Sequence, residues 1–319
     1  SVHEMSGANA QSSVELGQAI DKISELSDNS KNKMQLIASA IENQVTSVDS
    51  VFSSLQEAKI SCQTLTTAST YVEAETFKLS ELTEHSYRSF AKISGDNVFQ
   101  RSLKLARDLS VQIEKLFLEK IKKSEISLDD FLFTDYREIK SSDISKLNHL
   151  FDVLDVPKEG FTPPKYLTKY DLLIDLDLQK LLDQTKAKEK KLVFVIALDL
   201  NAYAPVHNSE FCQKWSGDKE IDLAQNRVKR FFDDNLVLVR GARVGLGEAS
   251  AQLPKRASRD QFIQAGCHLT LDETPTDDFL VQTYARDTGV ILTALTVPIF
   301  IKEERWGSVA LGWNEDVLN

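Results

Sequence analysis

The run Lys191-Leu-Val-Phe-Val-Ile-Ala-Leu-Asp199 decides the fold of the C-terminal part of the chain. It is a short, continuous apolar segment rich in β-branched and aromatic residues, which predicts a buried central strand. The polar stretch Leu200-Asn-Ala-Tyr203-Ala-Pro-Val-His207-Asn208 follows it directly. We therefore expect hydrogen-bonding side chains at the rim of a sheet, where they can line a ligand pocket.

Further strands are predicted on the C-terminal side of this run, at Leu236–Arg240, Phe279–Tyr284, Val290–Ile301 and Gly307–Trp313. The last two are separated by Lys302-Glu-Glu-Arg305-Trp306, a short polar connection that predicts an antiparallel hairpin. The segment between Asn208 and Phe232 is predicted to be helical. Together these elements predict an α+β fold, a sheet with helices on one side.

The N-terminal part has the composition of a long helix, because residues 14–82 contain no proline and only one glycine, Gly17. Apolar residues recur there at alternating spacings of three and four, which keeps one stripe facing a partner helix. The stripe runs through Leu16, Ile20, Ile23, Met34, Ile37, Ile41, Gln44, Val48, Val51, Leu55, Ala58, Cys62 and Leu65, and Val45, Phe52 and Ile60 widen it. We expect a dimeric coiled coil or bundle; the alternative is a solvated linker helix.

The pattern breaks near Ile93-Ser-Gly95-Asp96-Asn97, where Asp96 or Asn97 can cap a second helix that ends in the basic turn 120–123. Short helical pieces are predicted at Leu128–Leu132 and Asp143–Val153, and a further helix at Leu178–Ala187. A proline-bearing strip, 156–166, predicts an extended arm. The expected organisation is a helical segment at 1–92, a helical connector and arm at 93–175, and a sheet domain at 176–319.

Composition excludes several classes of function. The formal net charge is −10, and the chain lacks a strong basic patch, so nucleic acid is not expected as a partner. The three cysteines, Cys62, Cys212 and Cys267, form no CxxC pair, which favours a reducing compartment. No run approaches the roughly 20 apolar residues that a bilayer span needs. We expect a cytoplasmic protein, with membrane attachment through upstream residues left open.

The candidate ligand-binding residues cluster around the sheet. They are Asp199, Tyr203, His207, Asn208, Asn226, Arg227, Arg230, Tyr284, Arg286, Asp287 and Trp306. Since arginine binds a carboxylate in bidentate geometry, this mixture predicts an anionic or zwitterionic small ligand. The structural alternative is a salt-bridge network between the Asn226-Arg-Val-Lys-Arg230 segment, Asp233-Asp234 and Arg286-Asp287, and a core-packing role for Trp306.

His207 is the only candidate metal or haem ligand in this cluster, with Cys212 as a nearby helper. A structural histidine that holds its loop is the competing interpretation. The sequence carries no GxSxG, Walker A or HExxH motif, so we do not expect an enzyme. A hydrolase built from Cys212 or Cys267 with His207 or His268 rests on residue types alone.

Two stretches resemble a known family. The stretch from Glu4 to Ile23, with Gln11-Ser-Ser-Val-Glu15-Leu-Gly-Gln-Ala-Ile20, resembles the late signalling helix of bacterial methyl-accepting chemotaxis proteins. Residues 98–319 resemble a PAS/Cache-like sensor module found at the C-terminus of some chemoreceptors. The second resemblance is carried by D-x-N-x-Y-x-P-x-H-N at 199–208, N-R-x-x-R-x-F-D-D at 226–234, L-x-Q-T-Y-x-R-D at 280–287, and Trp306-Gly307. Ala202 and Arg305 depart from the pattern, which has glycine and often histidine there.

The resemblance implies a chemotaxis signal transducer in which a small molecule or cofactor, haem included, biases a dimeric helical bundle. It also implies a chemotaxis kinase and coupling protein as partners, provided that the glutamate-rich tip they contact lies upstream. A dimeric scaffold protein without a ligand, or a Cys/His hydrolase, are the alternatives. Neither methylation sites nor the ligand's identity follow from these residues.

Overall fold

The computed structural model describes residues 2–92, 95–152, 160–233, 236–274, 279–285 and 291–314. Its secondary structure mixes helices with antiparallel sheets, which confirms the α+β class. The chain separates into two compact units, Ser1–Phe77 and Lys78–Asn319. The three-part division expected above stays a prediction. Of the helices in the described ranges, none combines the length and the apolar character that a membrane crossing requires.

The first unit is part of one long helix, α1 (Val2–Ala91), which confirms the expected N-terminal helix and extends it at both ends. Along the predicted stripe, apolar residues recur from Leu16 to Leu65, with polar residues at Ser27, Ser30 and Gln44. The large apolar residues on this stripe between Leu16 and Leu65 are each 54–73% exposed. Exposure of so many apolar side chains is unfavourable, and the dimer or bundle expected from the sequence stays a prediction.

The second unit begins with the last turns of α1 and continues into α2 (Val98–Lys122). Asn97 caps α2, as its side chain accepts a hydrogen bond from the backbone N–H of Gln100 at 2.9 Å. The expected break between the two helices is therefore confirmed. Tyr87 near the end of α1 packs on Phe99 in the first turn of α2, with ring centroids 4.8 Å apart.

A four-stranded antiparallel sheet forms the centre of the second unit, in the order β3 (Leu192–Asp199), β8 (Glu304–Asn314), β7 (Ile291–Ile301) and β6 (Leu280–Ala285). β3 is the strand predicted from its apolar run. β7 and β8 form the expected hairpin, and Lys302 and Glu303 in its turn have positive φ angles of 49° and 72°. Such angles match the twist of a tight hairpin.

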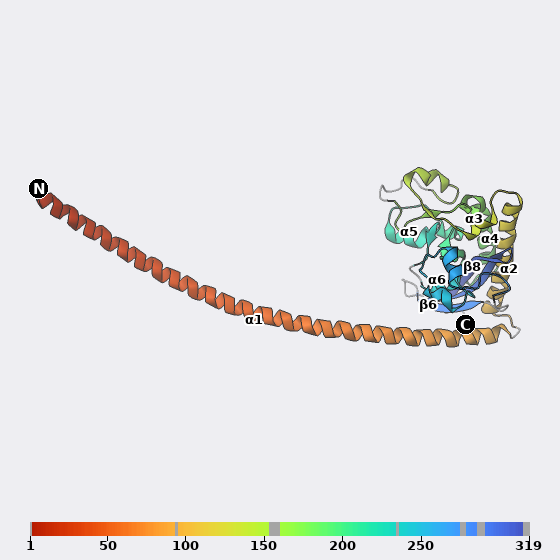
Figure 1. Ribbon diagram of the computed structural model, residues 1–319, viewed down its shortest axis with the longest axis horizontal. Helices are drawn as coiled ribbons and strands as arrows, with labels where there is room; N and C mark the ends of the chain where they lie inside the picture. The colour runs from red at the N-terminus through yellow and green to blue at the C-terminus, as the bar shows by residue number, and fades with distance from the viewer. Residues whose placement is uncertain are drawn as a thin grey trace. The chain divides into compact units, whose positions relative to one another are not determined.

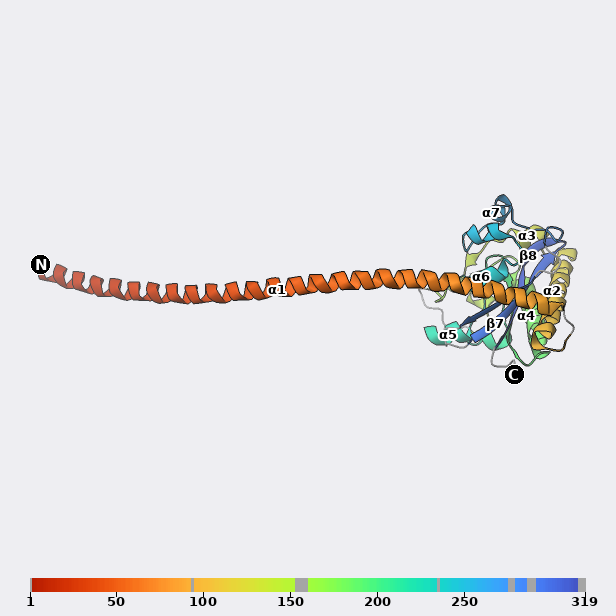
Figure 2. The same ribbon diagram turned by 90° about the horizontal axis from the view of Figure 1, so that it is seen from below.

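Helices cover both faces of this sheet, which corrects the expectation of helices on one side. α2 and α4 (Asp171–Ala187) pack on the face that carries Val195 and Val309, whereas α6 (Leu236–Ala242) packs on the opposite face with Ile196 and Ala310. The sheet lies between α6 and the pair α2 and α4 in both views (Figures 1 and 2). Because successive strand residues point to opposite faces, β3 serves two cores.

The segment Leu236–Arg240 was expected to be a strand and is instead the body of α6. Its run Leu-Val-Leu-Val is apolar and β-branched, and a short run of this kind does not distinguish a strand from a buried helix. The helical form is favoured because Leu238, Val239 and Ala242 then cover the second face of the sheet. Leu178–Ala187 is helical as predicted, although α4 begins earlier, at Asp171.

The segment between Asn208 and Phe232 is helical only in part. It contains a 3-10 turn, η2 (Ser209–Phe211), one short helix, α5 (Lys219–Gln225), and a two-residue strand, β5 (Arg230–Phe231), that pairs with β4 (Tyr203–Ala204). The helix expected at Asp143–Val153 is reduced to the 3-10 helix η1 (Ser141–Lys146), and residue 153 lies outside the described residues. Part of the expected arm, 156–159, also lies outside them.

Short elements complete the second unit. The predicted helix α3 (Leu128–Leu132) is confirmed, with Ser127 as its cap. β1 (Arg137–Glu138) pairs with β2 (Tyr166–Leu167). The 3-10 helix η3 (Glu248–Gln252) and the helix α7 (Arg259–Gln264) follow α6 and lie before the hairpin.

The close approach of β8 to β3 explains the glycine of the Trp306-Gly307 pair. A Cβ atom on Gly307 would lie 2.0 Å from the backbone oxygen of Leu198 and 2.7 Å from the Cα of Asp199. Gly307→Ala should therefore lower the free energy of unfolding by about 3 kcal/mol or more, since backbone atoms cannot move aside as a side chain can. Urea unfolding followed by tryptophan fluorescence measures this, because all three tryptophans lie in the second unit.

Gly17→Ala is the matched control, because nothing lies within 4 Å of the added methyl group. It should leave the tryptophan transition unchanged. Equal stability of the Gly307→Ala variant and the unmodified protein would contradict the assigned strand contact.

Candidate functional site

Asp199 lies at the end of β3 with only 3% of its surface exposed. The hydroxyl of Tyr136 donates to its Oδ2 at 2.5 Å, and the backbone N–H groups of Asn201 and Tyr203 donate to its Oδ1 at 2.9 and 3.1 Å. No cation of the described residues forms an ion pair with it. Burial raises the pKa of this carboxyl to about 6, and the three hydrogen bonds only partly offset that effect.

The side chain of Asn201 joins this carboxylate to the loop before α7. Its Nδ2 donates to the Tyr136 oxygen at 3.1 Å and to the carbonyl of Ala257 at 2.9 Å, and its Oδ1 accepts from the N–H of Ala257 at 2.9 Å. The buried guanidinium of Arg243 fixes the same loop by donating to backbone carbonyls of Leu200, Ser250, Leu253, Pro254 and Lys255. The Asp199 surroundings are therefore held rigidly.

A cavity of about 240 Å³ opens beside Asp199. Much of its wall is aromatic, from Phe131, Phe133, Tyr136, Phe262 and Trp306. Trp306 is 2% exposed, and its Nε1–H has no hydrogen-bond partner among the described residues. A buried indole donor of this kind is available to a ligand that carries an acceptor atom. This volume lies just below that of typical small-molecule sites.

The other charged groups of the cavity wall are Arg259 and Asp260. Arg259 donates to Glu304 at 2.6 Å and to the carbonyl of Arg305 at 2.7 Å, so its charge is matched within the protein. Asp260 is exposed at the solvent side of the cavity. The cavity therefore has one carboxyl group at its buried end, a second at its mouth, and an arginine that is already paired.

Tyr203 connects Asp199 to a second buried cluster rather than to the cavity. Its hydroxyl donates to Asp171 at 2.6 Å, and Lys229 bridges Asp171 and Asp175 with Nζ–O distances of 3.2 and 2.6 Å. These side chains are at most 1% exposed. Burial raises the pKa of Asp171, although the Lys229 ammonium opposes that shift. The cluster fastens α4 to the segment before β5.

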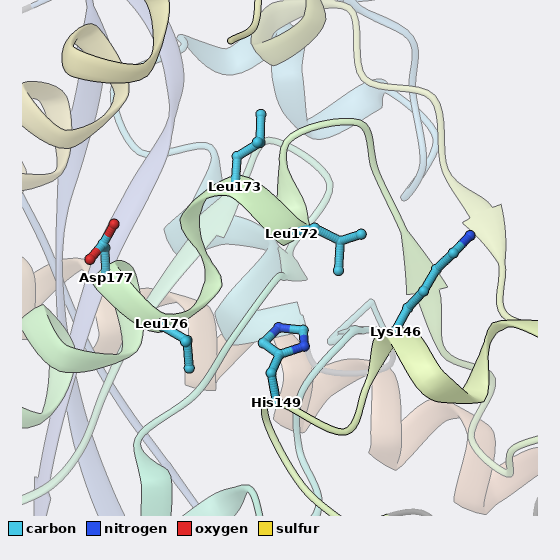
Figure 3. Close-up of a pocket in the computed structure, with 6 residues that line it drawn as sticks. All are labelled: Lys146, His149, Leu172, Leu173, Leu176 and Asp177. Atoms are coloured by element: carbon cyan, nitrogen blue, oxygen red, sulfur yellow. The ribbon is translucent and has the colours of Figure 1, made fainter. Parts of the chain in front are cut away.

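His149 contacts this cluster through Asp175 and also lines a hollow at the surface. Its Nε2 lies 2.8 Å from Oδ2 of Asp175, and the ring lies between Lys146 and Leu176 (Figure 3). The hollow, of about 410 Å³, is lined by Lys146, His149, Leu172, Leu173, Leu176 and Asp177. None of these residues belongs to the predicted site. The Asp199 cavity is the better candidate, because its polar groups are buried and convergent.

His207 is held by its neighbours. Its Nδ1 accepts the backbone N–H of Asn208 at 2.8 Å, so the geometry assigns the ring proton to Nε2. The ring packs on Phe211, with centroids 4.6 Å apart. The Cys212 Sγ lies near carbonyl oxygens, and burial raises the pKa of this thiol to about 12. Within the described residues, no three His, Cys, Asp or Glu side chains form a metal site.

The remaining predicted residues lie apart from the Asp199 cavity. Asn208 accepts from the N–H of Val195 and donates to Asp183, and Asn226 donates to the carbonyl of Gln213. The guanidinium groups of Arg227 and Arg230 lie 5.2 and 4.6 Å from the centre of the Phe232 ring. Tyr284 packs beside the core under α6. Arg286 and Asp287, together with Asp234, lie outside the described residues.

Of the predicted ligand-binding residues, the structure brings Asp199 and Trp306 to one cavity. The sequence did not single out Tyr136, Arg259 or Ala257, which are distant along the chain and belong to no recognisable motif. Asn201, which the sequence places with Asp199 at the end of the buried strand, lies beside it as expected. Comparison of the chain with protein-family models, with curated proteins and with solved structures gave no match.

The raised pKa of Asp199 predicts a pH-dependent stability. Between about pH 4 and pH 6 the folded protein holds this proton more tightly than the unfolded chain, so stability falls as the pH rises through that window. The contribution is about 3 kcal/mol, from a pKa shift of about two units. Asp199→Asn should remove it, and chemical unfolding at a series of pH values measures the difference.

The matched control is Asp177→Asn, which removes an exposed carboxylate from α4 and should retain the wild-type pH profile. If Asp199→Asn and the wild type showed parallel stability across the window, Asp199 would not be the buried titrating group.

Lys229→Met should lower the free energy of unfolding by about 3–5 kcal/mol, because it leaves Asp171 and Asp175 buried without their cation. Adding Asp175→Asn should recover part of the loss. Urea unfolding of the single and double variants measures both effects. A single variant as stable as the wild type would show that the cluster does not fasten α4.

Proposed function

We propose that the protein is a signal transducer of the chemoreceptor type, in which the Asp199 cavity binds a small molecule and α1 forms a dimeric coiled coil. One observation carries the proposal: α2 contacts the cavity wall at one end and the last turns of α1 at the other. Occupancy of the cavity can therefore act on α1 through a single rigid element.

The aromatic contacts at the two ends of α2 define this connection. Towards its C-terminal end, Phe117 packs on Trp306 and Phe131 of the cavity wall, with ring centroids 4.9 and 4.6 Å apart. In its first turn, Phe99 packs on Tyr87 of α1. The two phenylalanines are separated by about 27 Å of helix, given a rise of about 1.5 Å per residue.

Polar contacts also join the last turns of α1 to the sheet domain. Arg88 lies with its guanidinium carbon 5.6 Å from the centre of the Phe279 ring, just before β6. Glu84 lies 3.4 Å from Arg240 of α6 and 3.0 Å from Arg88. These contacts are partly exposed and individually weak, which permits rearrangement when the sheet domain changes.

The stripe on α1 supports a dimer with more than one accessible packing. Apolar residues such as Ile37 and Ile41 alternate with polar seam positions at Ser27, Ser30 and Gln44. Polar seam residues weaken a coiled coil, so the free-energy difference between two packings is smaller than in an all-aliphatic seam. A ligand that binds one state better then shifts the population.

The PAS/Cache-like identity of the sheet domain is part of the same proposal, supported by an antiparallel sheet with flanking helices. The proposal also includes a cytoplasmic location, and a chemotaxis kinase and a coupling protein as partners. A dimeric scaffold without a ligand is the second candidate. It is favoured by one observation: His207, Asn208 and Asn226 are engaged within the protein rather than directed at an open volume.

Cys62 offers a direct test of the proposed dimer. It occupies the seam and is exposed, whereas Cys212 and Cys267 are buried. In a parallel dimer in register, the two Cys62 residues face each other, so mild oxidation of the full chain should give a disulfide-linked dimer on a non-reducing gel. Cys62→Ser should abolish it.

Thr67→Cys in the Cys62→Ser background is the matched control, because position 67 lies on the side of α1 opposite the seam. It should cross-link far less than Cys62. A cross-linked yield at position 67 equal to that at Cys62 would contradict the assigned seam, and a chain that stays monomeric would exclude the dimeric transducer.

A further inference from the structure

The charge of the Asp199 cavity differs from the one that the sequence predicts. Arg227 and Arg230, which suggested an anionic ligand, lie against Phe232 rather than in the cavity wall. The arginine that does line the cavity, Arg259, is paired with Glu304 at 2.6 Å. Among the described residues, the carboxyl groups of Asp199 and Asp260 line this cavity without forming an ion pair.

The groups around Asp199 do not supply a counter-charge by contact. Tyr136 donates a hydrogen bond, and Asp171 beyond Tyr203 is a second carboxyl that disfavours ionisation. The buried Arg243 forms no ion pair with Asp199, and its guanidinium donates to the carbonyl of Leu200 and to four carbonyls of the loop before α7. An ionised Asp199 therefore has hydrogen bonds but no ion-pair partner in the described part of the chain.

The cavity wall favours a cation with apolar substituents. Five aromatic side chains line it beside a carboxyl group that is only 3% exposed, and burial strengthens the attraction between opposite charges. Ammonium groups also interact favourably with aromatic rings. Asp260 at the mouth adds a second negative charge on the path of entry.

We propose that this cavity binds a small organic cation, an ammonium group with short apolar substituents, and that Asp199 is its counter-charge. The assignment rests on the transducer function proposed above and names the chemical class of its ligand. The buried Nε1–H of Trp306, from the same wall, has no hydrogen-bond partner among the described residues and can donate to a ligand that also carries a hydroxyl or carbonyl oxygen.

Choline and its isosteres have similar shapes but different charges, so they test which ligand charge the cavity binds. The uncharged isostere is dimethylbutanol, in which a tert-butyl group replaces the trimethylammonium group, and the anionic one is dimethylbutyrate. Ethanolamine extends the series to a primary ammonium. Each is titrated into the full chain by calorimetry up to about 10 mM, a range that detects weak binding.

Choline or ethanolamine should bind and the two other probes should not. Asp199→Asn should weaken cation binding about tenfold to hundredfold, the range for losing a hydrogen-bonded ion pair, whereas Asp177→Asn should leave it unchanged. Tryptophan fluorescence checks that both variants are folded. Since choline keeps its charge at every pH, its affinity should fall about tenfold from pH 7.5 to pH 5 as Asp199 takes up a proton.

The outcomes separate the two proposals. If dimethylbutanol or dimethylbutyrate binds as tightly as choline, or if Asp199→Asn binds the cations as well as the wild type does, the cation assignment is wrong and the transducer proposal stands. If no probe of any charge binds while Cys62 still cross-links, the cation assignment is wrong and the dimeric scaffold is favoured.

Discussion

The close pairing of β8 with β3 at Gly307 is the constraint on which the rest of the second unit depends. It is possible only because residue 307 has no Cβ atom, and it places Asp199 and Trp306 next to each other at the end of the sheet. A carboxyl group is thereby buried against an aromatic wall. Burial of an unpaired charge is unfavourable. A ligand of opposite charge would therefore stabilise the ionised form of the Asp199 carboxyl.

The two functional parts of the chain share one helix junction. α2 contacts the cavity wall through Phe117 and α1 through Phe99, and both contacts are between aromatic rings in a packed core. Close-packed side chains transmit small displacements because they cannot be compressed. In the proposed dimer, the partly polar seam of α1 would lower the free-energy difference between two packings, so that a modest difference in ligand affinity between the two states would move the population.

The sequence predicted those elements whose structure is set by the spacing or composition of neighbouring residues. The long helix α1, the strand β3 and the hairpin turn at Lys302 each follow from spacing or composition within a few residues. Leu236–Arg240 could not be assigned in the same way, because only the uncovered second face of the sheet selects its helical form. Within the site, Asp199 and Trp306 were predicted from motifs, whereas Tyr136 and Arg259 reach the cavity through long-range folding. Arg227 and Arg230 lie against Phe232 rather than in the cavity wall, and no local pattern predicts that placement.

The central claim is that binding of a small cation in the Asp199 cavity alters the packing of α1. The most direct measurement is the distance between nitroxide labels at position 67 of the two chains, by pulsed electron resonance, in Cys62→Ser/Thr67→Cys protein with and without choline. The buried Cys212 and Cys267 are present in both samples and serve as the labelling background. The account predicts that choline shifts the distance distribution between two populations. Superimposable distributions in a folded dimer would contradict it.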